Sequence, residues 1–136
     1  MELVLDANIL IAALLKEGIT RKLLFNDELI LYTPEFIIEE FFKHITQLAK
    51  KAQTTEQSLH NLVKELIIES TITIITKDDL RSYIKKAEAI SPDPDDVMYF
   101  ATALKYKCSI WSNDKRLKNQ QVIRIYTTHD LLSRFT

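Results

Sequence analysis

Short apolar segments rich in β-branched residues alternate along this chain with longer segments whose apolar residues recur at helical spacing. We expect strands at residues 2–6, 29–32, 71–75, 109–112 and 122–126. We expect helices at about residues 7–16, 20–27, 34–51, 56–69, 77–90, 95–107 and 128–135. Parallel strands are joined by crossing helices, which cover both faces of their sheet. The alternation therefore predicts an α/β protein, a three-layer α/β/α fold with a roughly five-stranded parallel sheet.

Glycine and proline mark the expected ends of several elements. Gly18 is expected to end the first helix. Thr33 is expected to cap the next long helix, with Pro34 at its first position. Two prolines within residues 91–94 predict a loop there.

Composition sets limits on the class of protein. The 136 residues predict a single domain over residues 1–136, without repeats or linkers. Cys108 is the only cysteine, so no internal disulfide forms, and a reducing, cytoplasmic setting is expected. Gly18 is the only glycine, which excludes Gly-rich phosphate loops. No signal peptide is apparent, and no apolar run approaches the ~20 residues that span a bilayer.

Two aspartates follow directly on expected strands. Asp6 comes after the apolar run Leu3-Val4-Leu5, and Asp114 comes shortly after residues 109–112. Parallel strands end at a common edge of the sheet, where α/β folds bind their ligands. A carboxylate at the border of the core is costly unless a cation meets it. Asp114 is also compatible with a simple turn, because Asn and Asp favour turns.

Further acids stand near helix starts and on a buried helix stripe. Asp95 and Asp96 open a helix after the proline loop, where the helix dipole alone would favour them. Glu40 stands beside the apolar stripe of the helix expected at 34–51, whereas Glu39 is turned by about 100° toward solvent. His44 lies one helical turn after Glu40 and is expected to be a surface residue.

Acids that converge on one edge repel one another unless a divalent cation lies among them. Carboxylate oxygens suit Mg²⁺ or Mn²⁺ better than Zn²⁺, and no cluster of His and Cys residues competes. We therefore expect carboxylate oxygens at this edge to lie within ligand distance, ~2.0–2.6 Å, of a common ion. The net charge of −1 leaves no global attraction for nucleic acid, so a metal or a local basic patch must provide it.

Four short motifs occur in an order that resembles the PIN domain family, including VapC-like toxin ribonucleases. They are Leu3-Val4-Leu5-Asp6-Ala7-Asn8, the helix from Pro34 that carries Glu40-Phe41, Asp93-Pro94-Asp95-Asp96-Val97-Met98-Tyr99-Phe100-Ala101-Thr102-Ala103-Leu104, and Ile110-Trp111-Ser112-Asn113-Asp114-Lys115-Arg116-Leu117. The resemblance spans residues 2 to about 126. Many members of the family carry a further acid two residues after the fourth, where this chain has Arg116.

The resemblance implies a Mg²⁺- or Mn²⁺-dependent endoribonuclease that cleaves single-stranded RNA. The catalytic and metal-binding residues it implies are Asp6, Glu40 (with Glu39 as second choice), Asp96 and Asp114. The supporting residues are Asn8, Ser112, Asp95 and Asp93. Basic residues flanking the third and fourth acids are expected to contact RNA, unless they form only a solvated basic face: Lys105, Lys107, Lys115, Arg116 and Lys118.

The partners implied by the resemblance are an RNA substrate, an antitoxin protein if the chain is a toxin, and a second copy of the chain. Phe42, Ile45 and Leu48 suit either a dimer face or core packing. Whether the site holds one metal or two, and whether the chain is a toxin or an RNA-processing enzyme, stays open at this point.

Two other classes of protein also gather acids of this kind. A non-catalytic RNA-binding or scaffold PIN domain is the first alternative, although such degeneracy usually shows as a lost acid. A receiver-like phosphotransfer domain is the second. It needs an acid on a central strand and a lysine on a late strand, whereas residues 71–75 contain no acid and residues 122–126 offer Arg124 but no lysine.

Overall fold

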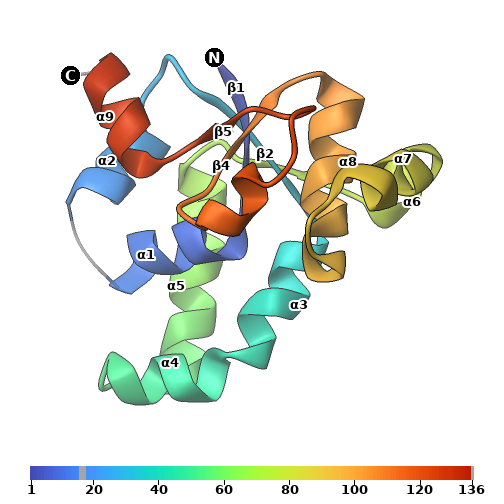
Figure 1. The fold of residues 1–136 in the computed structure, drawn as a ribbon. Coiled ribbons are helices and arrows are strands. Elements are labelled where there is room, and N and C mark those ends of the chain that lie inside the picture. Colours follow the sequence, from blue (N-terminus) through green and yellow to red (C-terminus); the bar gives the residue numbers. More distant parts are fainter. Residues whose placement is uncertain (16–17, 136) are drawn as a thin grey trace.

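The computed structural model describes residues 1–15 and 18–135, which form a five-stranded parallel sheet with helices on both faces (Figure 1). The strands are β1 (Glu2–Leu5), β2 (Ile30–Pro34), β3 (Thr73–Ile75), β4 (Ser109–Trp111) and β5 (Ile125–Tyr126). Their order in the sheet is β3-β2-β1-β4-β5, and every neighbouring pair is parallel. The predicted α/β/α fold is confirmed.

The α-helices lie between and after the strands. They are α1 (Ala7–Leu15), α2 (Ile19–Leu24), α3 (Phe36–Lys43), α4 (Ile45–Lys51), α5 (Glu56–Glu69), α6 (Lys77–Leu80), α7 (Ile84–Ile90), α8 (Val97–Tyr106) and α9 (Thr128–Phe135). Short 3₁₀ helices are η1 (Arg81–Tyr83), η2 (Pro94–Asp96) and η3 (Lys115–Lys118). None of the helices in the described ranges is long and apolar enough to cross a membrane.

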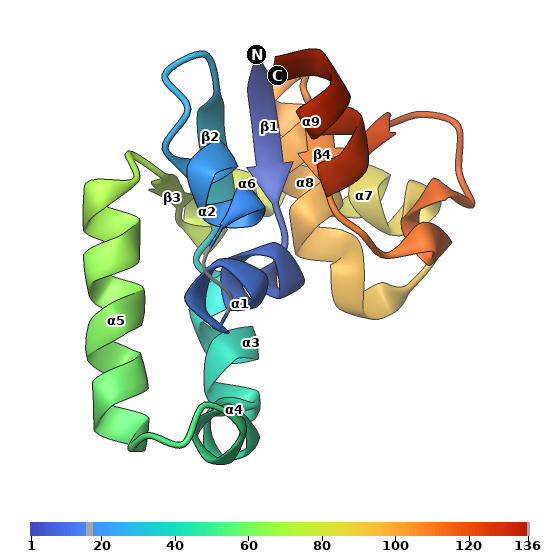
Figure 2. The ribbon, with the colours of Figure 1, turned by 90° about the vertical axis from the view of Figure 1, so that its left-hand side faces the viewer.

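Alternation along β1 divides the core into two layers. Leu3 and Leu5 pack with residues of α1, α2, α3, α5 and α9 on one face of the sheet. Val4 points to the other face and packs with α6, α7 and α8, where Phe100 is fully buried. Figure 2 shows the α3–α4–α5 segment extending past the end of β1. The sheet is thus buried on both sides, as its nearly continuous apolar strands require.

The expected helix start at Thr33 and Pro34 is wrong, because both residues belong to β2. The Thr33 hydroxyl donates a hydrogen bond to the Leu5 carbonyl (3.0 Å), so its side chain is not free to cap a helix. Pro34 pairs in register with Ile75, and the following amide of Glu35 donates to the Ile75 carbonyl (2.9 Å). Tertiary pairing with β3 thus overrides the local Thr-Pro signal, and α3 begins at Phe36.

Two helices predicted as continuous are divided. The helix expected at 34–51 breaks at His44. The His44 amide donates to the Phe41 carbonyl, whereas an α-helix would use the Glu40 carbonyl, and this tighter turn separates α3 from α4. The helix expected at 77–90 is divided into α6, η1 and α7. Gly18, with φ of 122°, lies directly before α2. The predicted end of the first helix at residue 16 lies outside the described residues.

Two strands are shorter than predicted by two residues or more, whereas β1 and β4 each end one residue early. Thr71 has a positive φ of 58°, which is incompatible with extended structure, and β3 begins at Thr73. The Gln120 side chain accepts hydrogen bonds from the amides of Val122 and Ile123 (both 2.8 Å). These contacts hold the segment in a turn, so β5 contains only Ile125 and Tyr126.

The position of β1 in the sheet determines where a ligand can bind. From β1 the chain moves outward through β2 to β3, and it then returns to place β4 on the other side of β1. Open α/β sheets bind ligands outside the carboxyl ends of the strands at such a reversal. Asp6 follows β1 and Ser112 follows β4, so both residues stand at this point.

Candidate active site

A pocket of about 170 Å³ opens at the carboxyl ends of β1 and β4. Its walls come from segments that are far apart in the sequence. The lining residues are Asp6, Ala7, Asn8, Ile11, Glu40, His44, Asp93, Asp95, Asp96, Tyr99, Asp114 and Arg116. The structure therefore brings the four predicted metal-binding acids, Asp6, Glu40, Asp96 and Asp114, to one cavity. Asn8, Asp93 and Asp95 line the same cavity. Ser112 reaches the same site through Asp6.

Asp6 is the most buried acid of the pocket, at 5% exposure. Its Oδ2 accepts a hydrogen bond from the Ser112 hydroxyl (2.5 Å), and its Oδ1 accepts one from the Ile9 amide (3.0 Å). Burial raises the pKa of Asp6 to about 6, the two hydrogen bonds oppose that rise, and the charge of Asp114 adds to it. The carboxylate is thus held in place by hydrogen bonds that compensate only part of its desolvation.

Asp96 stands where η2 meets α8, and its surroundings also disfavour its charge. Burial raises its pKa to about 6, with further contributions from the charges of Asp93, Asp6 and Asp114. Its carboxylate makes no capping hydrogen bond to α8. The Asp93 carboxylate instead accepts from the Asp95 amide (2.9 Å) at the start of η2. Helix capping therefore explains Asp93 better than it explains Asp96.

Arg116 neutralises the fourth acid. Its Nε and Nη2 atoms donate to Oδ1 (3.1 Å) and Oδ2 (2.9 Å) of Asp114, and its Nη1 lies 3.9 Å from Oδ2 of Asp93. This pairing lowers the pKa of Asp114. The position where the family often has another acid thus supplies a guanidinium counter-ion to the pocket.

The structure distinguishes the two candidate glutamates of α3. Glu40 is half-buried and lines the pocket, whereas Glu39 is exposed and does not. His44, expected as a surface residue, is indeed exposed but also lines the pocket beside Glu40. His44 is four residues after Glu40, and this spacing predicts that the two side chains lie on the same face of a helix and therefore near the same pocket.

Tyr99 is the residue of this site that sequence reasoning missed. It is 2% exposed, and its hydroxyl is buried with no hydrogen bond of ordinary geometry among the described residues, although the Ala7 amide lies near it. Burial raises its pKa, and the negative charges of Asp6 and Glu40 add to that rise. Tyr99 follows Asp96 by three residues, a spacing that places both side chains on one face of α8. A buried hydroxyl of this kind in a polar pocket can serve a bound molecule.

The carboxylates of the pocket are suited to a divalent cation by their chemistry, but their positions in this structure do not form a metal site. No group of three or more His, Cys, Asp or Glu side chains within residues 1–15 and 18–135 is close enough to hold a metal ion. The expectation of four carboxylates around one ion is therefore not met by the side chains as they stand. The physical reason at Asp114 is its pairing with Arg116. Oxygen-only donors and mutual repulsion between Asp6, Asp96 and Asp114 remain suited to a hard cation.

The basic residues predicted to contact RNA do not all lie near this pocket. Lys105 and Lys107 stand at the far end of α8, about 12 and 15 Å from its start by the rise of the helix. The Lys105 ammonium lies over the rings of Tyr83 and Tyr106, 5.8 and 5.7 Å from their centroids. Lys115 and Lys118 share η3 with Arg116, and Lys118 lines a different hollow.

Comparisons with known proteins agree with this architecture. The family model described as "PIN domain" matches residues 4–131. The fold is similar to a chain in the crystal structure of VapBC2 from Rickettsia felis bound to a DNA fragment from their promoter, with a TM-score of 0.66 and 17% identity. That match covers 93% of this chain and 98% of the other. No curated protein matches the sequence. The family match extends over nearly the whole chain, and this chain therefore belongs to the PIN domain family.

Proposed function

We propose that this chain is an endoribonuclease that depends on a divalent cation, Mg²⁺ or Mn²⁺, and hydrolyses phosphodiester bonds in single-stranded RNA. The observation that carries the proposal is the convergence of Asp6, Glu40, Asp96 and Asp114 on one pocket at the reversal point of a PIN-domain sheet. PIN domains usually use divalent metal ions, and carboxylates of this density are the ligands that such ions prefer.

The acids of the pocket would bind the cation in this proposal. Asp6, Asp96 and Asp114 would hold it, and Glu40, which lines the same pocket, is a further ligand. A bound divalent cation polarises a phosphate oxygen and makes a water molecule more acidic. A carboxylate of the pocket that does not bind the cation can accept a proton from the attacking water. Once released from Asp114, the Arg116 guanidinium can bind a phosphate oxygen.

The test is cleavage of an end-labelled single-stranded RNA by the purified chain. We expect cleavage with Mn²⁺ or Mg²⁺ and none with EDTA. Hydrolysis by water expels the 3′ oxygen, so the products should carry 5′-phosphate and 3′-hydroxyl ends. Products that end in 2′,3′-cyclic phosphate, or activity that persists in Asp6→Asn and Asp96→Asn, would rule out the proposed site.

A non-catalytic RNA-binding or scaffold domain is the second candidate. It is favoured by the Arg116–Asp114 pair and by the lack of a ready metal cluster within the described residues. Calorimetric titration with Mn²⁺ separates the two functions. A nuclease must bind the ion in competition with Arg116, and Asp6→Asn must weaken that binding. A scaffold that Arg116 has neutralised would bind none at millimolar concentration.

We further propose that the chain is the toxin of a toxin–antitoxin pair and forms a homodimer. The similarity in fold to a chain of VapBC2 supports the first proposal. Co-purification with the product of the adjacent reading frame, and loss of RNA cleavage in that complex, would test it. Of the residues considered for a dimer face, Phe42 is 43% exposed, whereas Ile45 and Leu48 pack against the core. Sedimentation of Phe42→Ser against the unmodified chain tests the dimer.

A further inference from the structure

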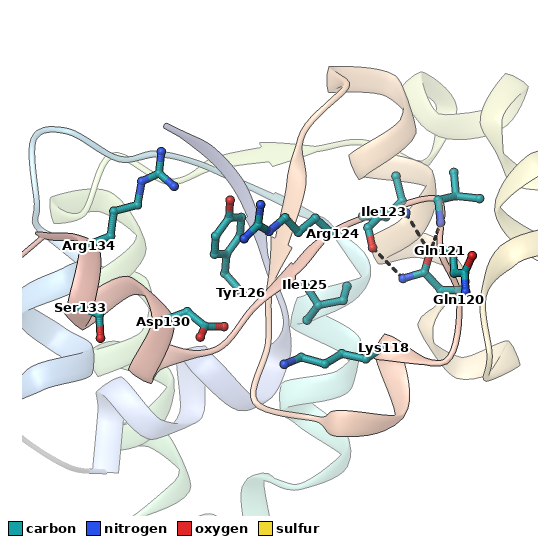
Figure 3. A pocket seen from close by; sticks show the side chains of 11 residues that line it. Lys118, Gln120, Gln121, Ile123, Arg124, Ile125, Tyr126, Asp130, Ser133 and Arg134 are labelled. Carbon is teal, nitrogen blue, oxygen red and sulfur yellow. Dashed lines mark hydrogen bonds between the residues drawn. The ribbon is translucent and has the colours of Figure 1, made fainter.

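A second and larger hollow, of about 860 Å³, lies beside β5 and is separate from the acidic pocket (Figure 3). Its walls are η3, the turn at Gln120, β5 and α9. It is lined by Lys118, Gln120, Gln121, Val122, Ile123, Arg124, Ile125, Tyr126, Asp130, Ser133 and Arg134. We call this hollow the β5 groove. We propose that the β5 groove binds the sugar–phosphate backbone of single-stranded RNA that extends from the acidic pocket.

The β5 groove is positively charged and its cations are available. Lys118, Arg124 and Arg134 are all exposed, and among the described residues that line the groove only Asp130 carries a carboxylate. The ion pairs found within residues 1–15 and 18–135 involve only Arg81 and Arg116, so none of the three groove cations is neutralised in this way. A patch of this kind gives a chain of net charge −1 a local attraction for a polyanion.

The one acid of the groove has a structural task. The Asp130 carboxylate accepts a hydrogen bond from the Thr127 amide (2.9 Å), and the Thr127 hydroxyl accepts one from the Asp130 amide (3.1 Å). This reciprocal pair begins α9. The hydrogen bonds lower the pKa of Asp130, and the charge of Lys118 adds to that effect. Asp130 thus stabilises the wall of the groove.

Arg124 gives the groove a flat surface as well as a charge. Its guanidinium carbon lies 4.7 Å from the centroid of the Tyr126 ring, and Figure 3 shows the two side chains together. Tyr126 is only 8% exposed, so the guanidinium covers the ring and leaves its own outer face to solvent. Guanidinium planes and aromatic rings stack on unpaired bases, which single-stranded RNA offers and duplexes do not.

The β5 groove and the acidic pocket are separate, but both are lined by residues of η3. Arg116 lines the acidic pocket, and Lys118, two residues later, lines the groove. The axial rise of a 3₁₀ helix separates their backbone positions by roughly 4 Å along its axis, and at three residues per turn their side chains point to different sides, one into each hollow. The side-chain amide of Asn113 and the indole of Trp111 both donate hydrogen bonds to the Thr128 hydroxyl (3.0 and 3.1 Å). These bonds tie α9, which carries Arg134, to the strand end that carries Asp114.

This inference rests on the proposed action on RNA, and binding tests it without requiring cleavage. The probe is a fluorescent single-stranded RNA of about 12 nucleotides, with anisotropy measured in EDTA at several KCl concentrations. We expect Lys118→Ala/Arg124→Ala/Arg134→Ala to weaken binding about tenfold or more near 0.1 M KCl, and to reduce the slope of log K against log[salt] by about 2. The matched control is Lys51→Ala/Lys85→Ala/Lys86→Ala, which also loses three exposed positive charges. It should bind RNA within about twofold of the unmodified chain, because positive charges far from the bound RNA are screened by salt and add little to its affinity.

Two further comparisons identify what the groove recognises. Arg124→Lys keeps the charge but loses the planar face, so its affinity for this RNA should fall while its salt slope is unchanged. Poly-L-glutamate serves as the probe for an acidic protein segment. If the triple variant binds RNA like the control but loses poly-L-glutamate, the groove belongs to a protein partner and the proposal is overturned.

The outcome is separable from that of the proposed nuclease. If the unmodified chain cleaves RNA in Mn²⁺ while the triple variant binds and cleaves RNA equally well, the groove proposal fails and the nuclease stands. If the groove variants lose RNA binding but no chain cleaves RNA, the nuclease fails and the groove stands. Equal thermal midpoints for the two triple variants establish that folding does not cause the difference.

Discussion

The Ser112 hydroxyl donates a hydrogen bond to Oδ2 of Asp6, across 106 positions of sequence and between two adjacent strand ends. The same Ser112 oxygen accepts the amide of Asp114 (3.0 Å). One hydroxyl therefore orients the first acid of the site and holds the loop that carries the fourth. Because β1 and β4 are parallel neighbours, this contact is a direct consequence of the strand order.

Ser112→Ala should move the pH dependence of RNA cleavage upward. In the unmodified chain the hydrogen bond from Ser112 lowers the pKa of Asp6. Its removal therefore raises that pKa further above about 6. We expect the acidic limb of the rate profile to shift by about half a unit or more, since a charge-assisted hydrogen bond contributes about 1.5–3 kcal/mol. Single-turnover rates between pH 5 and 8 measure the shift. An unmoved profile would show that Ser112 has no influence on the ionisation of Asp6.

The metal-free chain should lose stability as the pH rises from about 4 to about 6. The pKa of Asp6 is 3.8 in the unfolded chain and about 6 in the folded one, so the folded state binds more protons in that interval and stability falls with pH. A difference of this size corresponds to about 2–3 kcal/mol for this buried group. Urea denaturation in EDTA at pH 4.5 and pH 8 measures it. Asp6→Asn should remove the part of the difference that Asp6 causes and leave the part that Asp96 causes, and an equal pH dependence in that variant would contradict the assignment to Asp6.

Binding of Mn²⁺ should release protons near pH 6. The pKa values of Asp6 and Asp96 both lie at about 6, and a carboxylate must be ionised to bind a metal. Calorimetry in two buffers with different ionisation enthalpies counts the protons. We expect between one and two per ion at pH 5.5 and close to none at pH 8. Release that is independent of pH would place the ion elsewhere.

Arg116→Ala should tighten binding of Mn²⁺. The guanidinium occupies both oxygens of Asp114, so a cation must displace it before Asp114 can serve as a ligand. The Arg116 side chain of this pair is mostly exposed to solvent, which weakens the pair, so we expect an increase in affinity of about threefold to fivefold. Lys115→Ala, which removes the adjacent positive charge, is the matched control. Weaker binding after Arg116→Ala would mean that Arg116 supports the metal site.

Tyr99→Phe should leave the fold at least as stable as that of the unmodified chain. The Tyr99 hydroxyl is buried with no hydrogen bond of ordinary geometry among the described residues, and an unmade hydrogen bond of this kind costs about 1–3 kcal/mol. Thermal unfolding measures the effect. If Tyr99 contacts the substrate, cleavage should fall in this stable variant. A clear loss of stability would instead reveal a hydrogen bond that the structure does not contain.

The overall fold and the convergence of the acids were predictable because both follow from strand ends. Once β1 and β4 are parallel and central, Asp6 and Asp114 must emerge at the same edge. Glu40 was distinguishable from Glu39 because helical periodicity alone places it beside Phe41 and the core. These predictions depend on regular geometry, which is encoded locally.

The remaining features depend on tertiary choices that local patterns do not contain. Thr33 donates to Leu5 across two strands, so its usual role as a helix cap is overridden. Arg116 pairs with Asp114 through a side-chain conformation that no spacing rule specifies. Lys105 and Lys107 are near the third acid in sequence, but α8 runs away from the pocket and carries them to its other end.

The central claim is that the acids of the pocket act together on RNA, and a matched pair of neighbouring glutamates tests it directly. Glu40 lines the pocket and Glu39, one residue earlier on α3, is exposed outside it. Single-turnover cleavage of a labelled single-stranded RNA in Mn²⁺ should fall by about 10²-fold or more in Glu40→Gln, as for loss of a group that acts at the reacting atoms. Glu39→Gln should cleave at the rate of the unmodified chain. Equal rates in the two variants, or equal losses, would contradict the account.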